Sequence, residues 1–273
     1  MQVRLKWLLM KTVKQGKIHY LQPAWGDQGN LVTGFTSRNG GSSRPPFNSL
    51  NLGFGSGDQL SQVEANRAVV ARSFDLEPHL LPTVNQVHGS EILVLDQSNP
   101  EVSHFQRVDS DAIITNQRNI LIGILVADCF PVILYDRKKH VAGVVHLGWR
   151  GAAVGLLGRT VKAMHEIFGC QPDELNAAIG PGIAAHSYEV DRPVRDAFRQ
   201  GTGQWERIAT EVSLGHWQLD LQKSISLQLD EAGLVRAAVD MVKECTCCHK
   251  EAFFSYRRDQ GRTGRQMGFA LLR

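Results

Sequence analysis

Three apolar segments of β type follow one another closely, at residues 120–126, 131–135 and 141–145. The polar residues 136–139 between the last two are enough for a turn and for little else. Parallel neighbours need a crossover of a dozen or more residues, so these strands are expected to be antiparallel or part of a mixed sheet. Because the first segment is apolar throughout, we expect a central strand that is buried on both faces.

Helical and strand patterns surround this central region. A helix is expected from Ser61, where Ser61 to Glu64 resembles a capping box, and another at residues 151–168, which place five apolar side chains on one face. Residues 1–30 are weakly patterned and are expected to form a loosely attached first segment, before one main domain over residues 31–273. Further helices are expected at 191–199 and 219–229, and further strands at 31–36, 81–87, 91–95, 111–115, 175–179, 235–241 and 267–272.

The composition is that of an ordinary globular protein, with 42% hydrophobic and 21% charged residues in a chain of 273. A net charge of only +3 argues against a nucleic-acid partner. The sequence contains neither a secretory signal nor an apolar stretch long enough for a bilayer, so we expect a cytoplasmic protein without a membrane partner. Five cysteines without a secretory signal favour reduced thiols over disulfides.

Three residues that can bind metals, His88, Cys129 and His146, each stand where an apolar run ends or a turn begins. Catalytic zinc sites use three protein ligands and keep one position open, and copper accepts the same ligand types. Zinc lowers the pKa of a bound water to about 7, which supplies a nucleophile at neutral pH. The three are scattered along the chain, however, so a metal site, a Cys–His pair and three unrelated core residues all remain open.

Four further residues are candidates for the same site. Asp128 precedes Cys129 and could orient a ligand or act as a base, or it could be a turn residue bonded to its own backbone. Arg67, Arg150 and Arg257 could bind a phosphate or carboxylate, because guanidinium groups suit both anions. The alternative for each arginine is a surface ion pair.

Cys245 and Cys248 form a C-x-x-C pattern that also contains Cys247 and is followed by His249. A structural zinc site of this kind normally needs a second such pair, which the sequence lacks. We therefore expect a structural role for these cysteines, with redox or metal chemistry as the lesser alternative.

Several motifs together resemble those of the YfiH-type laccase-domain family, also called polyphenol oxidase-type or purine nucleoside phosphorylase-type proteins. The resemblance runs from about residue 31 to the C-terminus. Two positions depart from the family pattern, Gly182 where a cysteine is often found and Cys247 where an aromatic residue is frequent. The matching motifs are Gly40-Gly41-Ser42 with Ser49 to Gly53, Asn66-Arg67, Gln86 to Gly89, Ala127 to Cys129 with Pro131, His146 with Gly148 to Gly151, Ile179 to Pro181, Tyr188 to Val190, Cys245-Thr246, and Phe253 to Asp259 with Gly264-Arg265.

The resemblance implies a single α/β (α+β) domain whose mixed sheets are packed in α/β/β/α layers. It also implies a metal, usually zinc, held by His88, Cys129 and His146. The activities it implies are phosphorolysis of purine nucleosides, methylthioadenosine included, deamination of adenosine, and copper-dependent oxidation of phenols.

We therefore expect a zinc-dependent purine nucleoside phosphorylase with adenosine deaminase and methylthioadenosine phosphorylase activity, because the sequence offers both a metal site and an anion site. Its substrates would be a nucleoside and phosphate. A copper-dependent polyphenol oxidase ranks second, since multicopper oxidases use His-x-His pairs and this chain has none. A metal-free Cys129–His146 hydrolase ranks third, and a binding protein with a structural metal fourth. The oligomeric state stays open.

Overall fold

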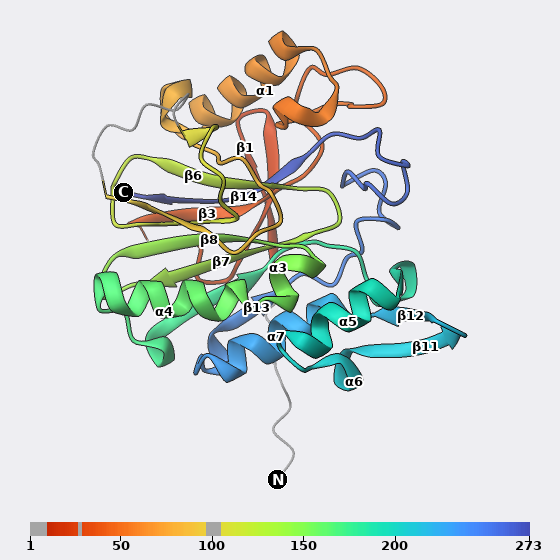
Figure 1. Ribbon diagram of the computed structural model, residues 1–273. Helices are drawn as coiled ribbons and strands as arrows, with labels where there is room; N and C mark the ends of the chain where they lie inside the picture. Colours follow the sequence, from red (N-terminus) through yellow and green to blue (C-terminus); the bar gives the residue numbers. More distant parts are fainter. Residues whose placement is uncertain (1–9, 27–28, 97–104) are drawn as a thin grey trace.

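Two β-sheets lie face to face and helices cover their outer faces (Figure 1). The structure, a computed structural model, describes residues 10–26, 29–96 and 105–273. From top to bottom in Figure 1 the layers are helix α1, a five-stranded sheet, a six-stranded sheet, and helices α4 and α7. This arrangement confirms the expected α/β/β/α layers.

The five-stranded sheet is antiparallel throughout. Its order is β1 (Lys11–Gln15), β2 (Ile18–Gln22), β3 (Leu31–Thr36), β14 (Gln266–Leu272) and β6 (Leu121–Val126). Strand β2 pairs with β3 and buries Ile18 and Tyr20, so the prediction of a loosely attached first segment is wrong for residues 10–26. The polar, exposed strand β1 carries no alternating pattern that would have revealed it.

The six-stranded sheet is mixed, with parallel pairs at its two edges and antiparallel pairs inside. Its order is β13 (Val239–Met241), β9 (Leu175–Ile179), β7 (Phe130–Asp136), β8 (Val141–Leu147), β5 (Ala112–Thr115) and β4 (Ile92–Leu95). Strands β7 and β8 form the antiparallel hairpin that the short connection predicted, whereas β6 belongs to the other sheet.

Alternating side chains along the central strands divide the core into layers. Ile122 and Ile124 of β6 and Ala142 and Val144 of β8 pack between the sheets, while Leu121 faces the α1 side. Strand β6 is therefore buried on both faces, as its apolar sequence predicted.

The helices follow the predictions with local differences. They are α1 (Leu60–Ser73), α3 (Trp149–Ala153), α4 (Leu156–Phe168), α5 (Arg192–Gln200), α6 (Trp205–Ile208) and α7 (Leu221–Glu231), with 3-10 turns η1 (Phe54–Ser56), η2 (Pro78–Leu80), η3 (Pro172–Glu174), η4 (Ala185–Ser187) and η5 (Arg236–Ala238). The helix expected at 151–168 is interrupted at Gly155, whose φ of 72° is left-handed. The capping box is wrong, because α1 begins at Leu60 and its N-cap residue Gln59 makes no side-chain cap bond.

Two predicted strands are absent or shorter. Residues 81–87 form only an isolated bridge at Asn85 instead of a strand. Pro82 has no N–H to donate to a neighbouring strand. The backbone of Leu125 forms its hydrogen bonds with the side-chain amide of Gln86 and not with its backbone. The strand expected at 235–241 is reduced to β13 behind the turn η5.

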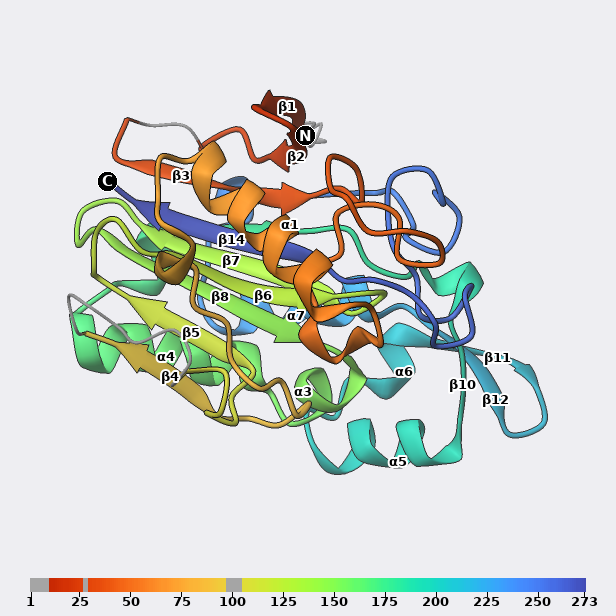
Figure 2. The same ribbon diagram turned by 90° about the horizontal axis from the view of Figure 1, so that it is seen from above.

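A small antiparallel sheet projects beside the two main sheets (Figure 2). Its order is β10 (Glu189–Asp191), β12 (His216–Leu219) and β11 (Ala209–Ser213). In the described part of the chain, no helix combines the length and apolar character needed to cross a membrane.

Candidate active site

The strand order of the six-stranded sheet brings Asp111, Cys129 and His146 together, because each lies at the same end of one of three neighbouring strands. Strand β8 ends beside the start of β7, with His146 opposite Pro131, so Cys129 lies next to His146. Strand β5 begins on the other side of β8, where the His146 N–H donates to the Asp111 carbonyl at 2.7 Å. Antiparallel pairing therefore unites residues that are far apart in the sequence.

The side chains of His88, Cys129 and His146 form a compact cluster, which we call the His–Cys–His cluster. One ligand atom of each lies within 4.8 Å of the other two. The Cys129 Sγ is 4.0 Å from His88 Nε2, and the two imidazole centroids are 4.8 Å apart at an angle of 76°. His146 is buried and His88 is exposed, so the cluster is anchored on one side and accessible on the other.

Asp111, which the sequence analysis did not single out, holds the cluster from behind. Its Oδ1 lies 2.7 Å from His146 Nδ1, and its carboxylate accepts backbone N–H bonds from Val87, His88 and Gly89 at 3.2, 3.1 and 2.7 Å. These bonds fix the turn in which His88 takes a left-handed φ of 59°. A carboxylate on the far nitrogen of a histidine fixes its tautomer and orientation, as in many metal sites.

The same contacts shift the ionisation of the cluster. Burial raises the pKa of the Cys129 thiol, but the His146 and His88 imidazoles outweigh this effect and lower it to about 6. Burial lowers the pKa of His146, whereas the Cys129 thiolate and the Asp111 carboxylate raise it to about 9. Burial also acts to raise the pKa of Asp111, but the bonds from His146 and the backbone N–H groups lower it below its ordinary value.

The cluster suits a thiophilic metal by the chemistry of its donors. It offers two imidazole nitrogens and a sulfur that readily becomes a thiolate, which are ligand types that catalytic zinc sites use. The Asp111 carboxylate adds the outer hydrogen bond that metal-binding histidines usually make. The accessible side leaves room for a further ligand.

A cavity of about 700 Å³ opens at the cluster. This volume lies within the range of small-molecule sites. Its walls combine the cluster with aromatic rings and arginines from several loops, namely Phe54, Trp149, Tyr188 and Tyr256 with Arg150, Arg257 and Arg265. Residues far apart in the chain thus form one concave surface, open to solvent, that can take an anionic or aromatic ligand.

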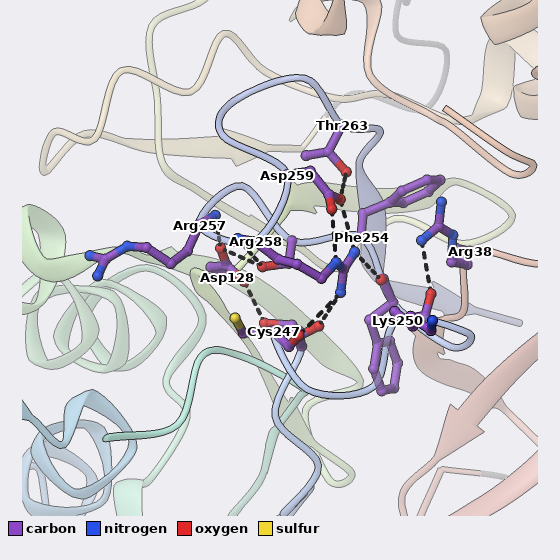
Figure 3. Close-up of polar contacts among 12 residues, drawn as sticks. Arg38, Asp128, Cys247, Lys250, Phe254, Arg257, Arg258, Asp259 and Thr263 are labelled. Carbon is purple, nitrogen blue, oxygen red and sulfur yellow. Dashed lines mark hydrogen bonds and ion pairs between the residues drawn. The ribbon is translucent and has the colours of Figure 1, made fainter. Parts of the chain in front are cut away.

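Asp128 lines this cavity, but its carboxylate is occupied (Figure 3). Its Oδ1 accepts the Thr246 hydroxyl at 2.6 Å, and its Oδ2 accepts the Ser255 hydroxyl at 3.0 Å and the Arg257 N–H at 2.7 Å. The residue has a left-handed φ of 85°. These contacts tie the loop before Cys129 to the C-terminal loops.

The three predicted anion-binding arginines lie in different surroundings. Arg150 and Arg257 are both exposed, and both line the cavity. Arg257 also donates from both Nη atoms to the Glu189 carbonyl at 3.2 and 3.1 Å. Arg67 does not line the cavity. It is buried, donates to the Leu52 and Leu81 carbonyls, and has a pKa that burial lowers to about 10.

Sequence reasoning also missed two residues of the cavity wall, Tyr188 and Arg265. Both belong to family-like motifs, which was the signal that could have identified them. Burial is the main cause that raises the pKa of the Tyr188 hydroxyl well above its ordinary value. Burial likewise lowers the pKa of Arg265, which donates to the Thr263 and Gly264 carbonyls.

A second group of possible metal ligands lies outside this cavity wall. His186, Cys245 and Cys248 also place ligand atoms within 4.8 Å of one another. Among the described residues, these two are the groups of three or more such side chains that could hold a metal ion.

Comparisons with known proteins identify relatives that match this chain over most of its length. The chain is 33% identical over 243 residues to the purine nucleoside phosphorylase YlmD of Bacillus subtilis, covering 88% of this chain and 87% of that protein. It is 36% identical over 233 residues to a purine nucleoside phosphorylase of Deinococcus radiodurans, covering 85% of each.

Solved structures give the same answer for the fold. The structure of YfiH from Bacillus licheniformis, described as a hypothetical protein, matches with a TM-score of 0.90 at 30% identity and covers 96% of this chain and 99% of that one. YlmD from Geobacillus stearothermophilus matches with a TM-score of 0.87 at 29% identity, over 97% and 99% of the two chains. Residues 32–273 match the family model described as multi-copper polyphenol oxidoreductase laccase. The chain therefore belongs to this laccase-domain family, as its motifs predicted.

Proposed function

We propose that this protein is a zinc-dependent purine nucleoside phosphorylase. The observation that carries the proposal is the joint placement of the His–Cys–His cluster, two accessible arginines and several aromatic rings around one cavity of about 700 Å³. The relatives named purine nucleoside phosphorylase support the same reaction. Its substrates are then a purine nucleoside and phosphate.

Arg150 and Arg257 are the residues that we propose to bind phosphate. A guanidinium carries five N–H donors in a fixed plane, so Arg257 keeps donors available beyond the two that contact Glu189. The guanidinium of Arg150 lies 4.3 Å from the Trp149 ring centroid, and that of Arg257 lies 5.2 Å from the Tyr188 ring centroid. Stacking of this kind orients both guanidinium groups at the cavity wall.

Aromatic residues of the same wall would bind the nucleoside. The rings of Trp149 and Tyr188 offer flat apolar surfaces for a purine. The Tyr188 hydroxyl is protonated at neutral pH, as in any ordinary tyrosine, and burial raises its pKa further, so it can donate a hydrogen bond. In phosphorolysis a phosphate oxygen forms a bond to ribose C1′ while the bond between C1′ and the purine breaks. The purine leaves with the bonding electron pair and takes up a proton from water, and the arginines would hold the attacking phosphate in place.

His88, Cys129 and His146 would hold the zinc ion. When bound there, zinc would supply Lewis-acid chemistry at the cavity wall. Asp111 keeps the His146 ring in place, and we propose that Asp128 positions Cys129 and Arg257 rather than acting as a base. The three hydrogen bonds that both Asp128 oxygens accept support this role. The two backbone carbonyls to which the buried Arg67 donates support a structural role for this residue.

Adenosine deamination and methylthioadenosine phosphorolysis are further reactions that we propose for the same cavity, since both substrates carry a purine. A cytoplasmic location remains a prediction from the sequence.

Two alternative functions each have one observation in their favour. The family description favours a copper-dependent polyphenol oxidase, which copper analysis and turnover of a simple phenol would test. The lowered pKa of Cys129 beside His146 favours a metal-free hydrolase. Persistence of activity after complete metal removal would identify that second alternative.

The experiment that tests the proposal measures release of free base and ribose 1-phosphate from inosine and adenosine, with and without phosphate. We expect phosphate-dependent products in the wild type, and their loss in Cys129→Ala and His146→Ala. Cys170→Ala is the matched control, because Cys170 is a core thiol whose pKa is raised to about 12, mainly by burial. Equal release of base without phosphate, or full activity in both cluster variants, would refute the proposal.

A further inference from the structure

We propose that His186, Cys245 and Cys248 form a second metal site, where a thiophilic cation such as zinc would connect two loops. The site is separate from the His–Cys–His cluster and goes beyond the proposed phosphorylase reaction. Its three side chains place one imidazole nitrogen and two sulfurs within 4.8 Å of one another.

Two of the ligands come from a single tight turn. The carbonyl of Cys245 accepts the N–H groups of Cys248 at 3.2 Å and of His249 at 3.0 Å, and this turn directs both sulfurs to the same side. A C-x-x-C turn is the usual source of two thiolates in structural zinc sites. The Cys245 sulfur also accepts the Ala184 N–H at 3.3 Å, a bond that favours the charged thiolate form.

The third ligand comes from a loop some 60 residues earlier. Gly182 forms a bridge with Cys245, and the Gly182 carbonyl accepts the Thr246 N–H at 3.0 Å. This bridge brings the short turn η4 alongside, so that His186 Nε2 lies 3.3 Å from Cys248 Sγ. The imidazole needed to complete the C-x-x-C pair is thus His186 and not His249, whose Nδ1 lies 3.1 Å from the Cys245 carbonyl oxygen.

The exposed side of this ligand group would leave room for a further ligand. Cys248 and His186 are exposed, so a cation and a water molecule can reach them without opening the core. The Ser187 hydroxyl, 3.6 Å from Cys248 Sγ, lies at the same side. Two thiolates with an imidazole select zinc over magnesium or calcium, which prefer oxygen ligands.

A cation at this position would link a loop of the active-site wall to a loop that supports this wall through Asp128. One loop carries Ile183 and Tyr188, which line the cavity, and the other carries Thr246, which donates to Asp128. Occupation of the site would therefore stabilise the wall around Cys129 without contacting the substrate.

The test is zinc stoichiometry of the full-length protein after saturation with zinc and gel filtration under reducing conditions. We expect about two zinc ions per chain for the wild type, and about one each for Cys248→Ser, His186→Ala and Cys129→Ala. The double variant Cys129→Ala/Cys248→Ser should bind almost none. Cys247→Ser is the matched control, because Cys247 lies on the same turn but outside the ligand group, and it should bind as the wild type does.

Cobalt substitution and thermal unfolding give readouts that are independent of activity. Cobalt added to Cys129→Ala should produce a thiolate-to-cobalt absorption band that disappears in the double variant, and zinc should raise the unfolding temperature of Cys129→Ala but not that of the double variant. Wild-type stoichiometry in both Cys248→Ser and His186→Ala would overturn the proposal, as would a Cys245–Cys248 disulfide in place of bound zinc. Loss of zinc in Cys248→Ser but not in Cys129→Ala would support this site and refute the metal of the proposed function.

Discussion

Replacement of Asp111 by asparagine should weaken both the fold and the metal site. The Asp111 Oδ1 faces the ring Nδ1 of His146 and accepts the backbone N–H of His88. Its Oδ2 accepts the backbone N–H groups of Val87 and Gly89. An amide has one oxygen, so two of these donors would face an NH₂ group instead of an acceptor.

The size of the effect follows from the number of donors left without an acceptor. Each buried donor without a partner costs about 1–3 kcal/mol, and two such donors give roughly 2–6 kcal/mol. Because His88 and Val87 lie at the surface, water can replace part of the loss, and we expect the lower half of this range. The lost carboxylate bond to His146 should in addition reduce zinc affinity about 10- to 100-fold.

Urea denaturation of the metal-depleted protein measures the first effect, and competition with a chromogenic chelator measures the second. Asp109→Asn is the matched control, since Asp109 is an exposed carboxylate on the same segment that accepts one bond from Asn85. Its free energy of unfolding should change by no more than about 0.5 kcal/mol. Our reasoning about Asp111 is refuted if Asp111→Asn matches this control in both stability and zinc affinity.

Three further predictions concern the active site. In Gly148→Ala the added Cβ would lie 3.0 Å from the Cys129 sulfur and 3.1 Å from His88 Cδ2. Zinc affinity measured by chelator competition should therefore fall about tenfold. An unchanged affinity would contradict the tight packing around Gly148. In the metal-depleted protein, alkylation of Cys129 followed by peptide mass spectrometry should decline as the pH falls below about 6 and be nearly constant above 7; a rate that rises up to pH 9 would contradict the lowered pKa. Arg150→Gln should raise the KM for phosphate about tenfold, since one charged hydrogen bond contributes about 1.5 kcal/mol. Arg159→Gln, on the exposed face of α4, is the control and should leave this KM unchanged. Equal KM values for the two variants would exclude Arg150 from the phosphate site.

The sequence predicted those parts of the fold that depend on local patterns of apolar and polar residues. Continuous apolar segments identified β6, β7 and β8, and the short connection between β7 and β8 fixed their antiparallel pairing. The polar, exposed strand β1 has no such pattern and was missed. Its extended conformation follows from its pairing with β2, which its own sequence does not reveal. The interruption at Gly155 was missed because the apolar spacing continues across it.

The site could be predicted in part for the same physical reason. His88, Cys129 and His146 were identified because each stands beside an apolar run, and the strand order then brought them together. Asp111 stands in the same kind of position, directly before β5, but a carboxylate at the start of a strand is also common in simple turns. Pairing of His186 with Cys245 and Cys248 depends on a bridge between distant loops, which no local pattern records.

Anomalous X-ray diffraction at the zinc absorption edge, from crystals grown with zinc, tests the central claim most directly. We predict a strong peak enclosed by the side chains of His88, Cys129 and His146, at the wall of the cavity that also holds Arg150. Clear density for all three side chains with no anomalous peak among them would contradict the account.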